Sequence, residues 1–92
     1  MEPVGKNDEL IENKRRRLIF RSDHRGTKEM DIILGSFARK YVPDFTEEEL
    51  NEFDALLSNN DPDLYNWITR KEEPPEDVMN GVLGKVLEFK LT

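Results

Sequence analysis

Apolar residues recur at helical spacing between Gly26 and Pro43, two residues that interrupt a helix. They stand at i, i+3, i+4, i+7, i+8 and i+11 and form a single stripe: Met30, Ile33, Leu34, Phe37, Ala38 and Tyr41. This period places them on one face of an α-helix, whereas a strand needs alternation of apolar and polar residues. The spacing therefore predicts a helix over about 27–41, ended by the proline.

Two further helices are expected on either side of this one. Residues 8–22 contain no glycine or proline and are rich in helix formers, which predicts a helix after a disordered tail of residues 1–7. Thr46 and Glu49 have the spacing of a capping box, in which each side chain bonds the other residue's backbone N–H. The apolar face that follows predicts a helix over about 47–58.

The last part of the chain adds two helices. Asp61 followed by Pro62 indicates a helix start, with the aspartate as N-cap and the helix ending near Arg70. A final helix is expected over about 76–89, loosened by two glycines. No stretch alternates like a strand. The predicted fold is all-α, a compact bundle of five short helices in a single domain of residues 8–92.

A chain of 92 residues with 36% hydrophobic residues can bury only a small core. Phe53 and Trp67 lie on apolar helix faces, so both are expected in that core rather than at an interface. Without cysteine, neither disulfides nor zinc–thiolate sites can form. No apolar run is longer than three residues, the length of Leu18-Ile19-Phe20, which is far too short to span a membrane.

Charge is strongly segregated along the chain, although the net charge is only −6. Residues 14–28, which include the run Lys14–Arg17, carry seven basic residues and one acidic residue; residues 44–63 carry eight acidic residues and no base. The two regions either are solvated helix faces that face each other or form a dipolar surface that steers an acidic partner. The net acidity argues against a general nucleic-acid binder, whose surface is basic.

The sequence does not bring together the groups that catalysis or metal binding needs. His24 is the only histidine and stands in a polar turn between Asp23 and Arg25. A metal site needs further ligands beside it, and a catalytic histidine needs a nucleophile. No calcium-loop, phosphate-loop or dinucleotide-binding spacing occurs. We therefore expect a protein that is not an enzyme, with no catalytic, metal-binding or cofactor-binding residues.

The segment Arg25-Gly26-Thr27-Lys28-Glu29, followed by Asp31, is the most unusual local feature. Local physics explains it as a helix start, with the glycine as N-cap, Glu29 opposite the positive end of the helix dipole and Arg25 as an exposed charge. A glycine at a junction also lets another chain approach closely, which favours a contact site. Both interpretations stay open at this point.

The order Arg25-Gly26-x-x-Glu29 resembles the R-G-x-x-E signature of the SdhE-type FAD assembly factors. Similar blocks follow in order over about residues 12–75: Phe37-x-x-x-Tyr41, Thr46-x-x-Glu49-Leu50-x-x-Phe53-x-x-Leu56-Leu57 and Asp61-Pro62-Asp63-Leu64-Tyr65-Asn66-Trp67-Ile68. The sequence departs from the pattern at Arg70, where the family has glycine more often.

The resemblance implies a monomeric five-helix chaperone that binds the flavoprotein subunit of succinate dehydrogenase or fumarate reductase. It would promote covalent attachment of FAD to a histidine of that client, which itself carries out the bond-making step. FAD would then be the cofactor of the client, and this chain would bind neither FAD stably nor nucleic acid. The implied partner-binding residues are Arg25, Gly26, Glu29 and, less strongly, Asp31.

Two other functions remain as alternatives: a general helical interaction module, and a nucleic-acid-associated regulatory module that uses the basic face of the first helix. The first 13 residues carry four acidic residues and one base, the opposite of a mitochondrial presequence. A bacterial cytoplasmic protein is therefore expected.

Overall fold

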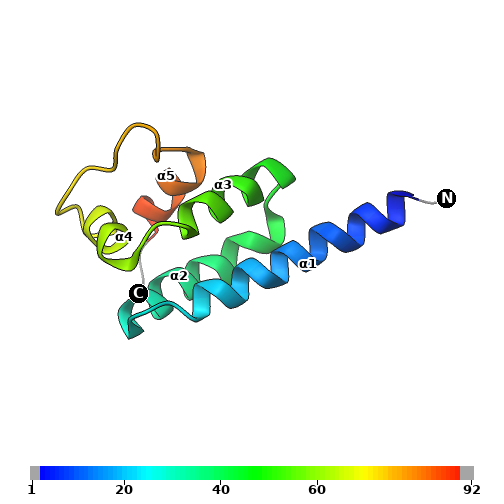
Figure 1. The fold of residues 1–92 in the computed structure, drawn as a ribbon, viewed down its shortest axis with the longest axis horizontal. Coiled ribbons are helices and arrows are strands. Elements are labelled where there is room, and N and C mark those ends of the chain that lie inside the picture. Colours follow the sequence, from blue (N-terminus) through cyan, green and yellow to red (C-terminus); the bar gives the residue numbers. More distant parts are fainter. Residues whose placement is uncertain (1–2, 90–92) are drawn as a thin grey trace.

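The computed structural model describes the backbone of residues 3–89 and the side chains of residues 10–89. Five α-helices and one short 3₁₀ turn follow one another, and no strand occurs within the described residues (Figure 1). Their bounds are α1 Pro3–Asp23, α2 Lys28–Tyr41, η1 Val42–Asp44, α3 Glu47–Leu57, α4 Asp61–Ile68 and α5 Gly81–Glu88. The prediction of an all-α bundle of five helices is confirmed.

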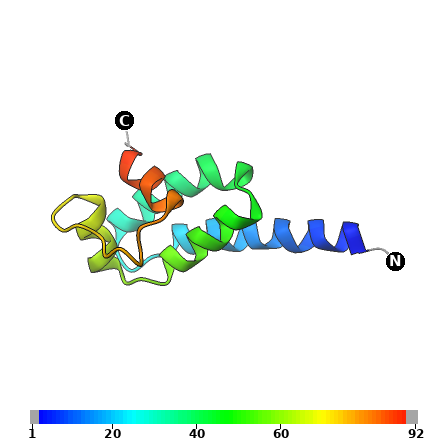
Figure 2. The same cartoon turned by 90° about the horizontal axis from the view of Figure 1, so that it is seen from above.

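Helices α1 and α2 pack against each other, α3 lies against α1, and α5 packs against α3 and α4. The first turns of α1 project beyond the other helices in both views (Figures 1 and 2), which explains the elongated extents of 50 × 27 × 22 Å. This helix begins at Pro3, so the structure makes residues 3–7 helical where the sequence predicted a disordered tail. Proline fits a first helical turn because the N–H that it lacks has no partner there.

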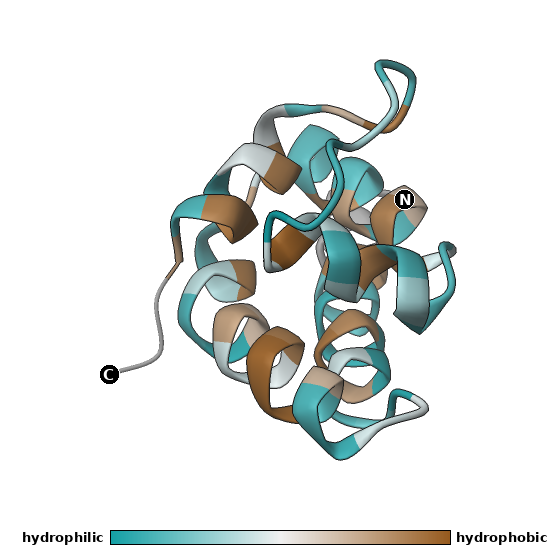
Figure 3. Ribbon diagram, turned by 90° about the vertical axis from the view of Figure 1, so that its left-hand side faces the viewer, coloured by the Kyte–Doolittle hydropathy of each residue, from teal (hydrophilic) through white to brown (hydrophobic). Residues whose placement is uncertain are grey.

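The core lies where the apolar faces of the helices meet (Figure 3). Phe37 and Phe53 are fully buried, and their ring centroids are 5.6 Å apart. Trp67 on α4 is only 5% exposed. The expectation that Phe53 and Trp67 are core residues is confirmed, and the stripe on α2 supplies much of the same core.

Side-chain caps set the starts of α3, α4 and α5. The Thr46–Glu49 capping box is present, with both of its hydrogen bonds formed. At α4 the N-cap is Asn60 rather than Asp61, because the Asn60 side chain accepts the Asp63 N–H at 2.9 Å. Asn80 caps α5 in the same way, so that helix begins at Gly81 instead of residue 76.

Helix α4 ends at Ile68 because the chain turns at Arg70, which has a φ of 66°. The Arg70 N–H donates to the Trp67 carbonyl oxygen at 3.1 Å, and the Lys71 N–H donates to that of Asn66 at 2.8 Å. This pair of bonds is a Schellman motif, whose left-handed residue is usually glycine. The departure noted at Arg70 is therefore a side chain in a conformation that suits glycine.

The basic face of α1 meets the acidic helix α3. Asp54 accepts from Arg21 Nη1 at 2.7 Å and has Lys14 and Arg17 within 3.8 Å. Arg15 Nη2 donates to the carbonyl oxygen of Phe45 at 2.8 Å. Of the two interpretations of the segregated charge, the structure supports the one in which the two regions face each other.

Candidate functional site

The side chain of Arg25 is held inside the protein, although it lies in the turn between α1 and α2. Its Nε donates to Asp61 Oδ1, and its two terminal nitrogens donate to the carbonyl oxygens of Leu57 and Asn59, each at 2.8 Å. The side chain is 12% exposed. Arg25 is thus not the exposed charge that local physics predicts; it ties the turn to the end of α3 and the start of α4.

Gly26 faces the same carboxylate. Its N–H donates to Asp61 Oδ2 at 2.5 Å, and a Cβ at this position would lie 2.9 Å from that oxygen. Real Cβ contacts do not come so close, so glycine permits this approach. The N-cap of α2 is Thr27, which accepts the Met30 N–H at 3.2 Å, and the interpretation of Gly26 as N-cap is wrong.

Asp31 also bonds within the turn, since its Oδ1 accepts the backbone N–H of Arg25. Three of the four predicted site residues, Arg25, Gly26 and Asp31, are thus linked by hydrogen bonds to one another or to Asp61. The sequence did not identify Asp61 as their partner, because its position beside Pro62 suggested a helix N-cap and nothing local connects it with a turn 35 residues earlier.

Glu29 is the member of the signature that faces outward. It lies in the first turn of α2, is exposed, and forms no hydrogen bond or ion pair with any side chain that the structure describes. A hollow of about 250 Å³ lies beside it, lined by Thr27, Glu29, Met30, Asp61, Pro62 and Tyr65. The site therefore offers a carboxylate without a partner among the described side chains, at the edge of a largely apolar depression between the starts of α2 and α4.

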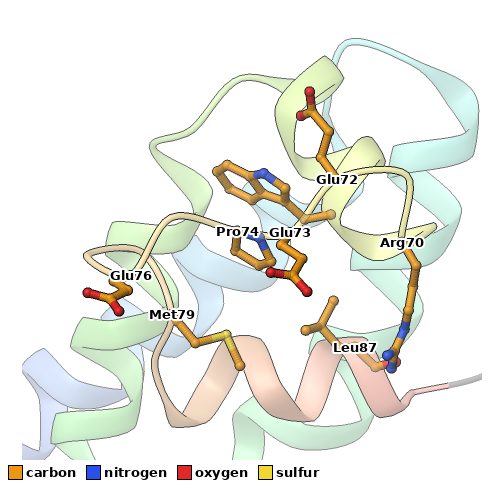
Figure 4. Close-up of a pocket in the computed structure, with 8 residues that line it drawn as sticks. Arg70, Glu72, Glu73, Pro74, Glu76, Met79 and Leu87 are labelled. Atoms are coloured by element: carbon orange, nitrogen blue, oxygen red, sulfur yellow. The ribbon is translucent and has the colours of Figure 1, made fainter.

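A larger hollow of about 420 Å³ lies under the loop between α4 and α5 (Figure 4). It is lined by Trp67, Arg70, Glu72, Glu73, Pro74, Glu76, Met79 and Leu87. The Arg70 side chain extends toward Leu87 and donates to its carbonyl oxygen at 3.3 Å. This hollow contains no residue of the signature.

His24 follows α1 directly and is bound to the last turn of that helix. Its Nδ1 donates to the Phe20 carbonyl oxygen at 2.8 Å, and its ring stacks on that of Phe20 with centroids 4.0 Å apart. Within the described residues, no three histidine or acidic side chains are placed to hold a metal ion. No helix of the described chain is both long and apolar enough to cross a membrane.

Comparison with known proteins places this chain in a family. Residues 16–90 match a family model described as flavinator of succinate dehydrogenase. Proteins named succinate dehydrogenase assembly factor 2, mitochondrial, are similar in three organisms. The protein of Scheffersomyces stipitis is 46% identical over 70 residues, 76% of this chain and 47% of that protein. The protein of Candida glabrata is 42% identical over 93 residues (97% and 61%), and that of Dictyostelium discoideum 42% over 82 residues (87% and 58%).

This chain spans about half to two-thirds of the length of these relatives. They are mitochondrial proteins of eukaryotes, which contradicts the prediction of a bacterial cytoplasmic protein. That prediction rested on the acidity of the first 13 residues, most of which belong to α1, a helix of the fold. The resemblance to the FAD assembly factors is confirmed, and the chain belongs to the family of flavinators of succinate dehydrogenase.

Proposed function

We propose that this protein binds the flavoprotein subunit of succinate dehydrogenase and promotes the covalent attachment of FAD to it. That subunit, or the corresponding subunit of fumarate reductase, is called the client below. The family model and the names of the relatives support a role in assembly of succinate dehydrogenase. The exposed Glu29 carboxylate beside an apolar hollow carries the assignment of the binding site.

In this proposal the protein acts by binding and not by bond-making. A helper that binds one conformation of its client more tightly than the others raises the population of that conformation. If the favoured conformation holds FAD and the client's histidine in reacting geometry, attachment is faster without a catalytic group on the helper. FAD then remains the cofactor of the client, and this chain acts as a monomer.

The basic face of α1 does not favour the nucleic-acid alternative. Lys14, Arg17 and Arg21 are grouped around Asp54, and Arg15 bonds a backbone carbonyl, so much of this charge is directed at the protein itself. Binding to phosphates would have to compete with these contacts.

The proposal is tested with Glu29→Gln, which removes the charge and keeps the shape. We expect the Kd for the client to rise about tenfold or more, since a charge-assisted contact contributes about 1.5–3 kcal/mol. Covalent flavin on the client, measured by in-gel fluorescence after coexpression, should fall accordingly.

Glu48→Gln is the matched control. Glu48 also stands two residues after a threonine N-cap, is exposed and lies in a first helical turn, that of α3. It therefore shares the helix-dipole contribution of Glu29 but not the hollow. A client that bound both variants as tightly as the wild-type protein would contradict the site assignment, and a wild-type protein that bound no flavoprotein would contradict the function.

A further inference from the structure

Asp61 joins two parts of the fold that are distant in the sequence. Its two carboxylate oxygens accept from different residues of one turn, Oδ1 from Arg25 Nε at 2.8 Å and Oδ2 from the Gly26 N–H at 2.5 Å. The side chain is 11% exposed. Although Asp61 begins α4, it does not cap that helix, because Asn60 does. Its carboxylate is therefore directed entirely at the turn that precedes α2.

The same carboxylate lies at the base of the candidate site. Asp61 lines the hollow together with Glu29 and Met30 from α2 and with Pro62 and Tyr65 from α4. The two walls of the hollow thus come from two different helix starts, and the bonds of Asp61 connect one start to the turn that leads into the other. We therefore expect a change in these bonds to alter the distance between the walls.

We propose that Asp61 is a positioning residue for client binding: it sets the hollow between Glu29 and Tyr65, which receives a basic side chain of the client. This inference rests on the proposed function. Both carboxylate oxygens of Asp61 are already bonded to Arg25 and Gly26, so Asp61 acts through the placement of the turn and hence of Glu29.

The chemistry of the hollow selects its occupant. Met30, Pro62 and Tyr65 provide apolar walls, and the charge of Asp61 is already matched by Arg25 at 2.8 Å. Glu29 is left as an acceptor without a described partner at the rim. A lysine or arginine side chain fits this arrangement, because its aliphatic stem packs on apolar surface while its head reaches a carboxylate.

The test begins with Asp61→Asn, which keeps the size of the side chain but has only one acceptor oxygen for two donors. Asp63→Asn is the matched control, since Asp63 is exposed and lies in the same first turn of α4. Both proteins are titrated against the purified client loaded with FAD, at a temperature where circular dichroism shows them folded. We expect Asp61→Asn to raise the Kd about tenfold and Asp63→Asn to leave it unchanged.

A double-mutant cycle distinguishes positioning from a structural role. If Asp61 acts through Glu29, the double variant Asp61→Asn with Glu29→Gln has a Kd within about twofold of that of the more weakly binding single variant. If the two residues act independently, the changes multiply to about a hundredfold, and this result would overturn the proposal. The proposal would also be overturned if Asp61→Asn bound the client with the same Kd as the wild-type protein. In that case, a rise in Kd caused by Glu29→Gln would still support the proposed function.

Gly26→Ala serves as a second variant should Asp61→Asn fold poorly. Its Cβ would press on Asp61 Oδ2 from 2.9 Å without removing the carboxylate. The expected result is the same rise in Kd and the same lack of additivity with Glu29→Gln. Glu29→Lys should abolish binding at low salt, because it places a like charge opposite the client's basic group; binding that survived would overturn the assignment of the occupant.

Discussion

Arg70 adopts a backbone conformation that is costly for any residue with a side chain. A left-handed φ brings Cβ close to the following carbonyl oxygen, at a cost of about 1–2 kcal/mol, and glycine avoids this contact. What Arg70 gains in return is one hydrogen bond to the Leu87 carbonyl oxygen at 3.3 Å, made by an exposed side chain. The Schellman bonds around it use only backbone atoms, so they do not depend on the arginine.

We therefore expect Arg70→Gly to raise the free energy of unfolding by about 0.5–1 kcal/mol, the left-handed cost less the additional chain entropy of glycine. Urea denaturation followed by circular dichroism measures this change. Arg70→Ala is the control, because it removes the same hydrogen bond but keeps Cβ. Equal stabilisation by both variants would show that the arginine side chain, and not the backbone, is the source of the cost.

The candidate site shows what residue patterns can and cannot predict. The signature residues are recognisable by their fixed spacing, and the structure places Arg25 and Gly26 in the turn before α2 and Glu29 in the first turn of that helix. Their separate roles could not be predicted, because the partner of Arg25 and Gly26 lies at Asp61 and sequence carries no sign of that contact. Asn60 and Asp61 are equally good N-cap residues, and only the structure shows which one bonds the helix.

At the scale of single elements, apolar periodicity predicts where each helix lies, whereas individual hydrogen bonds determine the residues at which it begins and ends. The α2 helix was predicted within a residue, since its apolar stripe is long and Pro43 marks its end. The α5 helix is shorter than predicted, because Asn80 caps it and the preceding N–H groups of Val78 and Met79 bond Pro75 instead. The helical spacing of apolar residues continues through this turn, so the spacing does not show where α5 begins.

The pairing of α1 with α3 provides a test at this scale. Asp54, whose side chain is 31% exposed, is the acceptor around which three cations of α1 gather. Asp54→Asn should lower the free energy of unfolding by about 1 kcal/mol or less, as exposed ion pairs do. The difference from the wild-type protein should shrink in 1 M salt, where charges are screened within about 3 Å. A loss of stability that did not change with salt would mean that packing, and not charge, accounts for it.

For the whole molecule, stability depends on a small aromatic core. Phe53 is fully buried and packs against Phe37 and Phe45, with ring centroids 5.6 and 6.2 Å away. A chain of 92 residues has few other large side chains to compensate for a cavity there. The core was predictable because it needs only apolar residues on the inner helix faces, whereas the projecting turns of α1 follow from no apolar pattern.

Phe53→Ala should lower the free energy of unfolding by about 3–5 kcal/mol, a large part of the stability of a domain this small. Thermal unfolding measured by circular dichroism tests this, with Phe20→Ala as control. Phe20 is the same residue type but is 61% exposed on α1, so its replacement should change the melting temperature little. Similar melting of the two variants would contradict the assigned core.

Because Arg25 bonds within the protein whereas Glu29 faces outward, mutations in the signature should fall into two kinds. Loss of the arginine leaves the end of α3 and the start of α4 without their donor, so the variant protein unfolds more often and is degraded faster in the cell. Higher gene dosage or a lower growth temperature should restore part of its activity. A Glu29 variant keeps its abundance and should respond to neither, so suppression by dosage separates mutations of architecture from mutations of recognition within one five-residue motif.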